Sequence, residues 1–216
     1  MIAVVARKTT LAIKRLADII ISGLGLVFFS PIMLVIALAV RLDSPGLILF
    51  RQRRIGLNGK EFWIYKFRSM VDDPERAASV THITDPLVTR VGRLLRLSSL
   101  DELPQLYSVL MGDMSLVGPR PLLPGTIFPS EIRRNNVRPG CTSLPVVSGR
   151  QSLDWEQRML LDLWYVDHWS LWLDLKILMK TVPVALSQKN VYNAQGHMLS
   201  RIGTSSAQDQ QSGKQI

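Results

Sequence analysis

Cysteine is almost missing from this 216-residue sequence, because Cys141 is its only example. A single thiol excludes an internal disulfide framework, and no Cys-x-x-Cys motif or Cys/His cluster with metal-ligand spacing occurs. The sequence also has no P-loop, no Gly-x-Gly-x-x-Gly turn and no serine-hydrolase elbow. These absences exclude disulfide scaffolds, zinc modules and several common nucleotide-binding and hydrolytic classes, and they are compatible with a reducing compartment.

Acidic residues are scarce beside basic ones, with 17 Asp and Glu against 26 Lys and Arg, a net charge of +9. Charge of either sign is missing from Ile19–Val40, a run of 22 residues. Hydrophobic residues make up 47% of the chain, which excludes intrinsic disorder for most of it. The composition therefore predicts one domain of ordinary size with an apolar appendage, and argues against a freely soluble protein.

The apolar run is long enough to cross a membrane, since 22 helical residues reach ~33 Å and the hydrocarbon core is ~30 Å thick. Ser30 and Pro31 interrupt its middle, where proline removes a backbone donor. Basic residues at both ends favour the cytoplasmic side for both ends. They are Arg7, Lys8, Lys14 and Arg15 before the run, and Arg41, Arg51, Arg53, Arg54 and Lys60 after it. We therefore predict a re-entrant, monotopic anchor that breaks at Ser30 and Pro31.

The pattern alone leaves three alternatives open for this run. A kinked helix could span the membrane, because proline is tolerated in membrane helices. A signal peptide could end at the Ala-x-Ala pattern of 37–39, although the run is longer than usual and basic residues follow. A buried helix of a soluble core is the third alternative.

The remainder predicts a mixed α/β, mainly helical domain. An apolar run at 47–50, an Asn-Gly turn at 58–59 and a strand at 61–68 indicate a small β-hairpin. Helices are expected at 87–97, from about 101 to 111, at 154–166 and at 170–187, with irregular chain at 71–86 and 125–150. The last two helices are rich in Trp and suit either a membrane interface or core packing. The predicted organisation is a basic lead-in at 1–15, the anchor at 16–41, the main cytoplasmic domain at 42–187 and a polar, disordered tail at 188–216.

Asp101 and Glu102 are adjacent carboxylates at the start of an expected helix. The pair has a structural explanation, because Asp101 could cap a helix and Ser99 with Glu102 matches the capping-box spacing. It also has a chemical one, because a carboxylate can attack phosphorus while its neighbour binds a divalent metal. Both explanations remain open at this level.

Cations recur around this pair in the sequence. Arg90, Arg93 and Arg96 follow helical spacing just before the acids, which is typical of a solvated face or of a phosphate clamp. Arg120 lies between two prolines, and Lys66 lies on the predicted strand beside apolar residues. Lys66 could bind phosphate or extend to water.

Several motifs occur in an order that is more specific than any one of them. They are Lys14–Arg15 with Asp18, the apolar run with Ser30–Pro31, Tyr65–Met70, Ser99–Gln105, Gly112–Pro121, Arg138–Gly140, Asp162–Val166 and Leu173–Leu178. In this order the sequence resembles the bacterial sugar transferases, the monotopic phosphoglycosyl transferase family, over roughly residues 12–183.

The resemblance implies an enzyme at the cytoplasmic face of the bacterial inner membrane. It would move a sugar-1-phosphate from a nucleotide sugar, a UDP-sugar by the family's pattern, to undecaprenyl phosphate. The product would start an exopolysaccharide, capsule, O-antigen or related glycan, for use by downstream glycosyltransferases. The resemblance assigns Asp101 as the covalent nucleophile, Glu102 with Asp101 as Mg²⁺ ligands, and Lys66, Arg96 and Arg120 as phosphate-binding cations.

One segment departs from the family's pattern. Residues 140–150 read Gly-Cys-Thr-Ser-Leu-Pro-Val-Val-Ser-Gly-Arg, where relatives commonly read Gly-Ile-Thr-Gly-Trp-Ala-Gln-Val-Asn-Gly-Arg. The change alters both the backbone freedom and the polar contacts of this segment. The resemblance therefore does not determine which nucleotide and which sugar this protein would use.

An alternative function of another class is a monotopic protein that binds anionic lipid through its basic residues and performs no chemistry. Such a protein has no use for Asp101 and Glu102 beside Arg96 and Arg120. A nucleic-acid binder is disfavoured by the apolar run and by the lack of a recognisable module.

Overall fold

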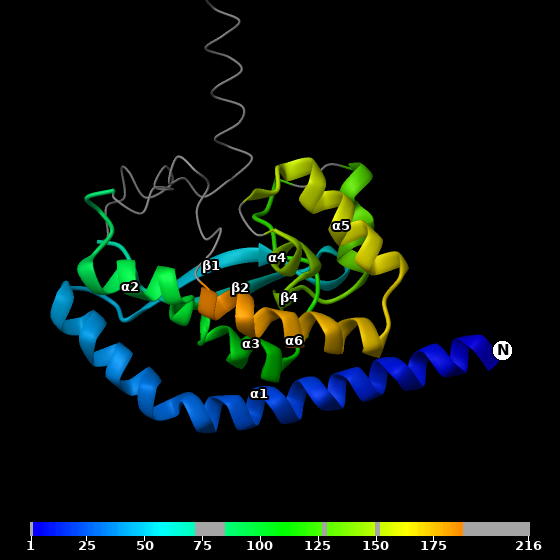
Figure 1. Cartoon of the computed structure of the whole chain (residues 1–216), viewed down its shortest axis with the longest axis horizontal. Coiled ribbons are helices and arrows are strands. Elements are labelled where there is room, and N and C mark those ends of the chain that lie inside the picture. The colour runs from blue at the N-terminus through cyan, green and yellow to red at the C-terminus, as the bar shows by residue number, and fades with distance from the viewer. Residues whose placement is uncertain (1, 72–84, 127–128, 150–151, 188–216) are drawn as a thin grey trace, which may run out of the picture.

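The computed structural model describes residues 2–71, 85–126, 129–149 and 152–187 (Figure 1). The mixed, mainly helical class predicted from the sequence is confirmed for this part of the chain. Its α-helices are α1 Ile2–Asp43, α2 Arg90–Ser98, α3 Gln105–Met111, α4 Leu144–Ser148, α5 Trp155–Asp167 and α6 Leu171–Ser187. Its strands are β1 Leu49–Ile55, β2 Glu61–Phe67, β3 Ser115–Val117 and β4 Gly140–Thr142, and its 3-10 helices are η1 Leu57–Gly59, η2 Leu100–Glu102 and η3 Pro129–Asn136.

The predicted hairpin is confirmed as the antiparallel pair β1–β2. Asn58 (φ 56°) and Gly59 (φ 78°) adopt the left-handed conformations that let the chain reverse between the strands. Alternation along β2 turns Phe62 and Ile64 into the main core and leaves Trp63 at the surface. The hairpin therefore carries Lys66, two residues beyond Ile64, on its inward face.

The expected helices at 87–97, 154–166 and 170–187 correspond to α2, α5 and α6. The helix expected from 101 to 111 is split into η2 and the shorter α3. Part of the segment expected to be irregular, 125–150, forms η3, β4 and α4, and β4 pairs in parallel with β3. The expected loop at 71–86 lies mostly outside the described residues, and the expected tail at 188–216 lies wholly outside them.

Helix α1 is a single helix of 42 residues that continues through Ser30 and Pro31. Pro31 has no N–H to donate to the carbonyl of Val27, four residues earlier, and the Ser30 hydroxyl donates to that oxygen instead at 2.7 Å. Figure 1 shows that the C-terminal part of α1 turns at an angle to its N-terminal part. The Ser-Pro pair therefore bends a helix that stays continuous, where the sequence had predicted a break at these two residues.

The first half of α1 is attached to the rest of the molecule by buried polar contacts. Lys14 Nζ donates to a carboxylate oxygen of Asp174 at 2.5 Å and to the carbonyl of Val117 at 3.0 Å. The Asp18 carboxylate accepts the backbone N–H of Leu116 at 3.0 Å. Helix α3 lies between this part of α1 and β2 (Figure 1).

The end of α1 is attached to the same body. Ile36 and Val40 are buried against Phe67 and Leu95 in a second apolar cluster. The Asp43 carboxylate accepts the N–H of Val91 at the start of α2, at 3.0 Å. Both flanks of the apolar run therefore contact one and the same domain.

Between these attachments the apolar side chains of α1 are exposed. Leu24, Val27, Phe28, Leu34 and Val35 have between 66% and 77% of their surface accessible. The helix is long and apolar enough to cross a membrane, and only 11% of its most apolar window is buried. Such an exposed surface indicates a lipid or protein partner.

The main core packs β2, α3, β3, α5 and α6 together. Tyr165 and Ile177 from the last two helices meet Val109, Met114 and Val117 there. Asp174 is a polar junction at the edge of this core, since it accepts the Tyr165 hydroxyl at 2.6 Å in addition to Lys14. Of the C-terminal Trp residues, Trp169 packs on the core, as one of the two interpretations predicted, whereas Trp172 is 62% exposed.

Candidate active site

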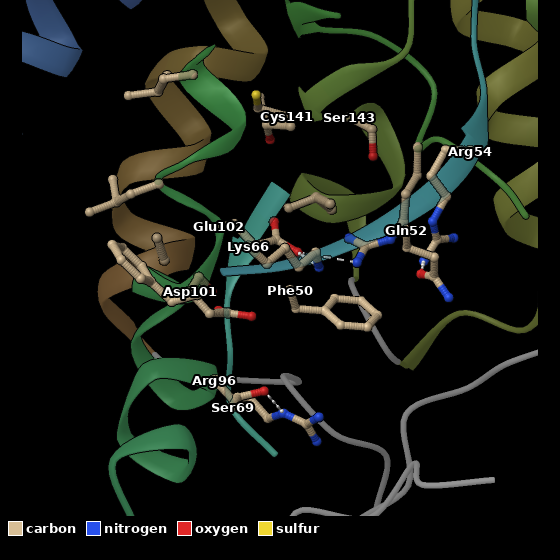
Figure 2. A pocket seen from close by; sticks show the side chains of 18 of the residues that line it. Phe50, Gln52, Arg54, Lys66, Ser69, Arg96, Asp101, Glu102, Cys141 and Ser143 are labelled. Atoms are coloured by element: carbon tan, nitrogen blue, oxygen red, sulfur yellow. Dashed lines mark hydrogen bonds and ion pairs between the residues drawn. The ribbon is translucent and has the colours of Figure 1, made fainter. Parts of the chain in front are cut away.

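A pocket of about 780 Å³ opens beside the β1–β2 hairpin, and its other lining residues come from α1, α2, η2, α3, β3, β4, α4, α5, α6 and the segments that connect them. All five predicted catalytic and phosphate-binding residues line it, namely Lys66, Arg96, Asp101, Glu102 and Arg120. Phe29 of α1 lines it as well, whereas its neighbours Ser30 and Pro31 do not. The structure therefore gathers residues that lie far apart in the sequence, and Figure 2 shows most of them.

The local backbone turns Asp101 toward the pocket. Ser99 adopts the left-handed conformation (φ 58°) and ends α2, so that the next three residues form the short turn η2. Helix α3 begins only at Gln105, with Pro104 at its N-cap, so Asp101 does not cap this helix and the structural alternative left open by the sequence does not hold. No side-chain capping bond of the kind expected between Ser99 and Glu102 occurs at η2. The left-handed residue Ser99 redirects the chain, so neither Asp101 nor Glu102 caps a helix.

Glu102 is held between two cations. Its Oε1 atom lies 2.6 Å from Lys66 Nζ and 3.4 Å from an Arg120 Nη atom. Burial alone would raise the pKa of Glu102, but the charges and hydrogen bonds of Lys66 and Arg120 outweigh it and lower the pKa to about 2. Glu102 is therefore a permanent anion near neutral pH.

Asp101 has the opposite electrostatic situation. Among the described residues, no hydrogen-bond or ion-pair partner reaches its carboxylate, which is buried to 9% exposure. Burial raises the pKa of Asp101 to about 6, helped by the negative charge of Glu102 and opposed by Lys66, Arg96 and Arg120. The site therefore holds an unpaired carboxylate that is ionised at neutral pH, as a nucleophile requires.

Of the three arginines with helical spacing, Arg90, Arg93 and Arg96, only Arg96 lines this pocket. Its Nε donates to Ser69 Oγ at 2.9 Å (Figure 2), whereas Arg90 and Arg93 are exposed on α2. Gly92 permits this approach, since a Cβ atom there would lie 2.1 Å from the Ser69 carbonyl oxygen. The phosphate-clamp interpretation can thus apply to Arg96, and the solvated-face interpretation describes the other two.

Sequence reasoning did not single out Arg54 as a site residue. The side chain lines the pocket and donates to Gln52 Oε1 at 2.6 Å, and its buried Nε has no hydrogen-bond partner among the described residues. Burial and the charge of Arg120 lower the pKa of Arg54 to about 10, against the opposing charge of Glu102. The same two-residue alternation along β1 indicates that Arg54 lies on the face of the hairpin that carries Lys66. In the sequence alone, Arg54 is instead one of the basic residues that flank the apolar run.

A buried ion pair between Arg134 and Asp162 holds the backbone at Arg120. Arg134 pairs with Asp162 and also donates to the backbone carbonyl of Arg120 at 2.7 Å. Burial raises the pKa of Asp162, whereas the charge and hydrogen bond of Arg134 act to lower it. This pair holds the Pro-Arg-Pro turn from η3 and α5, and the sequence contained no local signal for it.

The segment that departs from the family's pattern forms part of the pocket wall. Cys141, Ser143, Pro145 and Val146 line the pocket from β4 and α4. The substitutions therefore fall where a substrate would be bound.

The acids could hold a divalent cation only with help from a ligand. No group of three or more His, Cys, Asp and Glu side chains suited to a metal exists within the described ranges. Mg²⁺ is commonly bound by one or two carboxylates together with substrate phosphates. Asp101 and Glu102 fit that kind of shared site.

The chain is similar to known proteins over most of its length. The model of the family described as bacterial sugar transferase matches residues 9–188. The chain is 44% identical over 193 residues to the UDP-glucose:undecaprenyl-phosphate glucose-1-phosphate transferase of Caulobacter vibrioides, covering 83% of this chain and 72% of that protein. It is 44% identical over 183 residues to the uncharacterized sugar transferase EpsL of Bacillus subtilis, covering 83% and 90% respectively.

An uncharacterized sugar transferase of Haemophilus influenzae is 40% identical over 209 residues. That match covers 87% of this chain but 44% of the relative, so the chain spans less than half the length of some relatives. The family model and the two matches that cover most of both chains agree with the ordered motifs. The chain belongs to the bacterial sugar transferase family.

Proposed function

We propose that this protein transfers a sugar-1-phosphate from a UDP-sugar to undecaprenyl phosphate through a covalent aspartyl intermediate. Relatives named as undecaprenyl-phosphate glucose and galactose phosphotransferases support the substrate class. The observation that carries the proposal is the unpaired, buried carboxylate of Asp101, which lies in a pocket lined by Lys66, Arg96 and Arg120.

In the first step, an Asp101 carboxylate oxygen attacks the phosphorus atom that bears the sugar. The bond from that phosphorus to the bridging oxygen breaks, and UMP leaves with the electron pair. In the second step, a phosphate oxygen of undecaprenyl phosphate attacks the same phosphorus atom and displaces Asp101. The products are UMP and the sugar diphosphate lipid, and the carboxylate is regenerated.

The neighbouring residues stabilise the phosphates in this scheme. Lys66 and Arg120 approach from the side of Glu102, and Arg96 approaches from α2. Fixed cations at developing negative charge lower the barrier because they need no reorganisation during the step. Mg²⁺ bound by Glu102, Asp101 and substrate phosphates would neutralise further phosphate charge.

The attachment of α1 supports a monotopic arrangement for the proposed reaction. Lys14 and Asp18 before the apolar run, and Asp43 after it, bind the same domain. A helix that crossed the bilayer would place these flanks on opposite sides of it. We therefore propose that the exposed apolar part of α1 enters the cytoplasmic leaflet of the inner membrane and returns, which brings the pocket to the lipid phosphate.

The proposal extends to the product's use. A sugar linked to undecaprenyl diphosphate is a substrate for glycosyltransferases that extend it, so we place this step at the start of an exopolysaccharide, capsule, O-antigen or related glycan.

The test uses full-length protein in detergent or nanodiscs with Mg²⁺ and a panel of labelled UDP-sugars. Sustained UMP release should require undecaprenyl phosphate, and without it one equivalent should be released in a burst. Asp101→Asn should abolish both the burst and the turnover, whereas full turnover by this variant would contradict the nucleophile assignment. A protein that only binds anionic lipid would bind vesicles yet release no UMP with any sugar of the panel.

A further inference from the structure

Three serines are buried with hydroxyl oxygens that have no hydrogen-bond partner among the described residues. They are Ser108, Ser115 and Ser143, each with 2% exposure or less. A buried hydroxyl without a partner is disfavoured, so each one requires an explanation. Ser143 differs from the other two because it alone of the three lines the active-site pocket.

Ser143 lies where the chain leaves β4 and enters α4. It occupies the N-cap position of α4, yet its side chain makes no capping hydrogen bond there. Figure 2 draws its hydroxyl among the pocket side chains, on the other side of the Lys66–Glu102 pair from Arg96. The buried hydroxyl therefore keeps its hydrogen-bonding capacity, because the capping bond that would normally engage it is not made.

A second unpartnered polar atom belongs to the same pocket. Asp162 on α5 lines it, and its Oδ1 atom is buried without a hydrogen-bond partner in the described part of the chain. Its other carboxylate oxygen is held by Arg134, which fixes the direction of the group. Helix α4 packs against α5, so the two elements that carry Ser143 and Asp162 are neighbours.

We propose that Ser143 Oγ and Asp162 Oδ1 form a subsite that recognises a hydroxyl group of the nucleotide sugar. The inference rests on the proposed function and adds a specificity determinant to it. A serine hydroxyl can donate or accept, and a carboxylate oxygen accepts, which together suit a ligand hydroxyl. The polyprenyl chain has no hydroxyl groups, so the nucleotide sugar is the substrate that this polar wall fits. A site built to bind a hydroxyl also rejects analogues that lack it.

The hydroxyl could come from the sugar ring or from the ribose of the nucleotide. The test therefore measures equilibrium binding of UDP alone and of the UDP-sugar that the wild-type protein turns over, in an Asp101→Asn background that cannot consume the nucleotide sugar; KM and kcat are measured with Asp101 intact. Ser143→Ala should weaken binding of the nucleotide sugar at least fivefold, and raise KM with little change in kcat. An equal loss for UDP assigns the contact to the nucleotide, and a loss confined to the UDP-sugar assigns it to the sugar.

Ser108→Ala and Ser115→Ala are matched controls, because they remove the same buried, unpartnered group from outside the pocket. Both should bind nucleotide sugar as the wild type does. Ser143→Cys keeps the side-chain size with a much weaker hydrogen bond, and should show the same loss if the alanine variant fails to fold. Unchanged affinity for both ligands in folded Ser143 variants of an active enzyme would overturn the subsite, whereas absence of transfer by the wild type would instead overturn the proposed function.

Discussion

Lys66 Nζ lies 2.6 Å from Glu102 Oε1, and this contact engages the second carboxylate of the Asp101–Glu102 pair, whereas the first has no ion-pair partner among the described residues. Arg120 reaches the same oxygen atom at 3.4 Å. Two adjacent acids therefore acquire different properties, with the pKa of Glu102 lowered to about 2 and that of Asp101 raised to about 6. Environments that separate the pKa values of neighbouring carboxyls commonly mark a division of roles.

The first prediction is that the two acids affect stability in opposite directions. The pKa of Asp101 is above its unfolded value of 3.8, so the folded state binds more protons between about pH 4 and pH 6, and stability falls as pH rises through that window. Asp101→Asn should therefore raise the free energy of unfolding at pH 7 by about 1 to 3 kcal/mol, with little effect at pH 4.

Glu102→Gln is the matched control for that experiment. The pKa of Glu102 is below its usual 4.5, so its stabilisation is present above that pH and is lost as pH falls through about 2. Removing its charge at pH 7 should lower the melting temperature, because Lys66 and Arg120 lose their shared anion. Thermal unfolding in detergent at the two pH values measures both, and equal shifts of the same sign would contradict the assignment.

The second prediction concerns the pH dependence of the first chemical step. Only the ionised carboxylate of Asp101 attacks phosphorus, so kcat/KM should fall about tenfold per pH unit below a pKa of about 6. Single-turnover release of UMP between pH 4.5 and 8 measures this profile. A rate that is level down to pH 5 would show that Asp101 is not the group that must ionise.

The third prediction separates a substrate contact from a surface charge on one helix. Arg96→Ala should lower kcat/KM by roughly tenfold to a thousandfold, because it removes a fixed cation from the pocket. Arg93→Ala removes the same charge from an exposed position of α2 and should leave kcat/KM within about twofold. Steady-state kinetics with both variants test this, and equal losses would indicate a general effect of net charge.

The fourth prediction concerns the topology of α1. In a Cys141→Ser background, Thr9→Cys and Lys60→Cys place single thiols on either side of the apolar run. Both thiols should react with an impermeant maleimide from the cytoplasmic side of oriented membrane vesicles, because both flanks bind the same domain. Labelling from opposite sides would support a helix that spans the membrane.

The fifth prediction compares a buried ion pair with an exposed one. Lys14→Ala leaves Asp174 buried without its 2.5 Å partner and should cost about 3 to 5 kcal/mol of unfolding free energy. Arg53→Ala breaks the exposed pair with Glu61, 3.3 Å apart, and should cost less than about 1 kcal/mol. Chemical unfolding in detergent compares the two variants, and similar losses would mean that Lys14 does not anchor α1.

Sequence patterns correctly predicted those helices, strands and turns that are determined by residues close together in the chain. The Asn58–Gly59 turn, the alternation around Lys66 and the periodic helices α5 and α6 depend on neighbours in sequence, so they could be located without a fold. Asp101 does not cap a helix because the left-handed residue Ser99 redirects the chain, and no local pattern in the sequence indicated that conformation.

The sequence by itself was enough to locate the apolar run with its basic flanks and the hairpin. Its ordered motifs also singled out the candidate site residues, which are Asp101, Glu102, Lys66, Arg96 and Arg120. Only the tertiary structure decided that both flanks of α1 bind one domain and that Lys66 pairs with Glu102 rather than with Asp101. It alone placed Arg54 and Ser143 in the pocket. The physical reason is that ionisation and recognition depend on burial and on distances of a few ångströms between elements far apart in the chain, and such distances are set by packing.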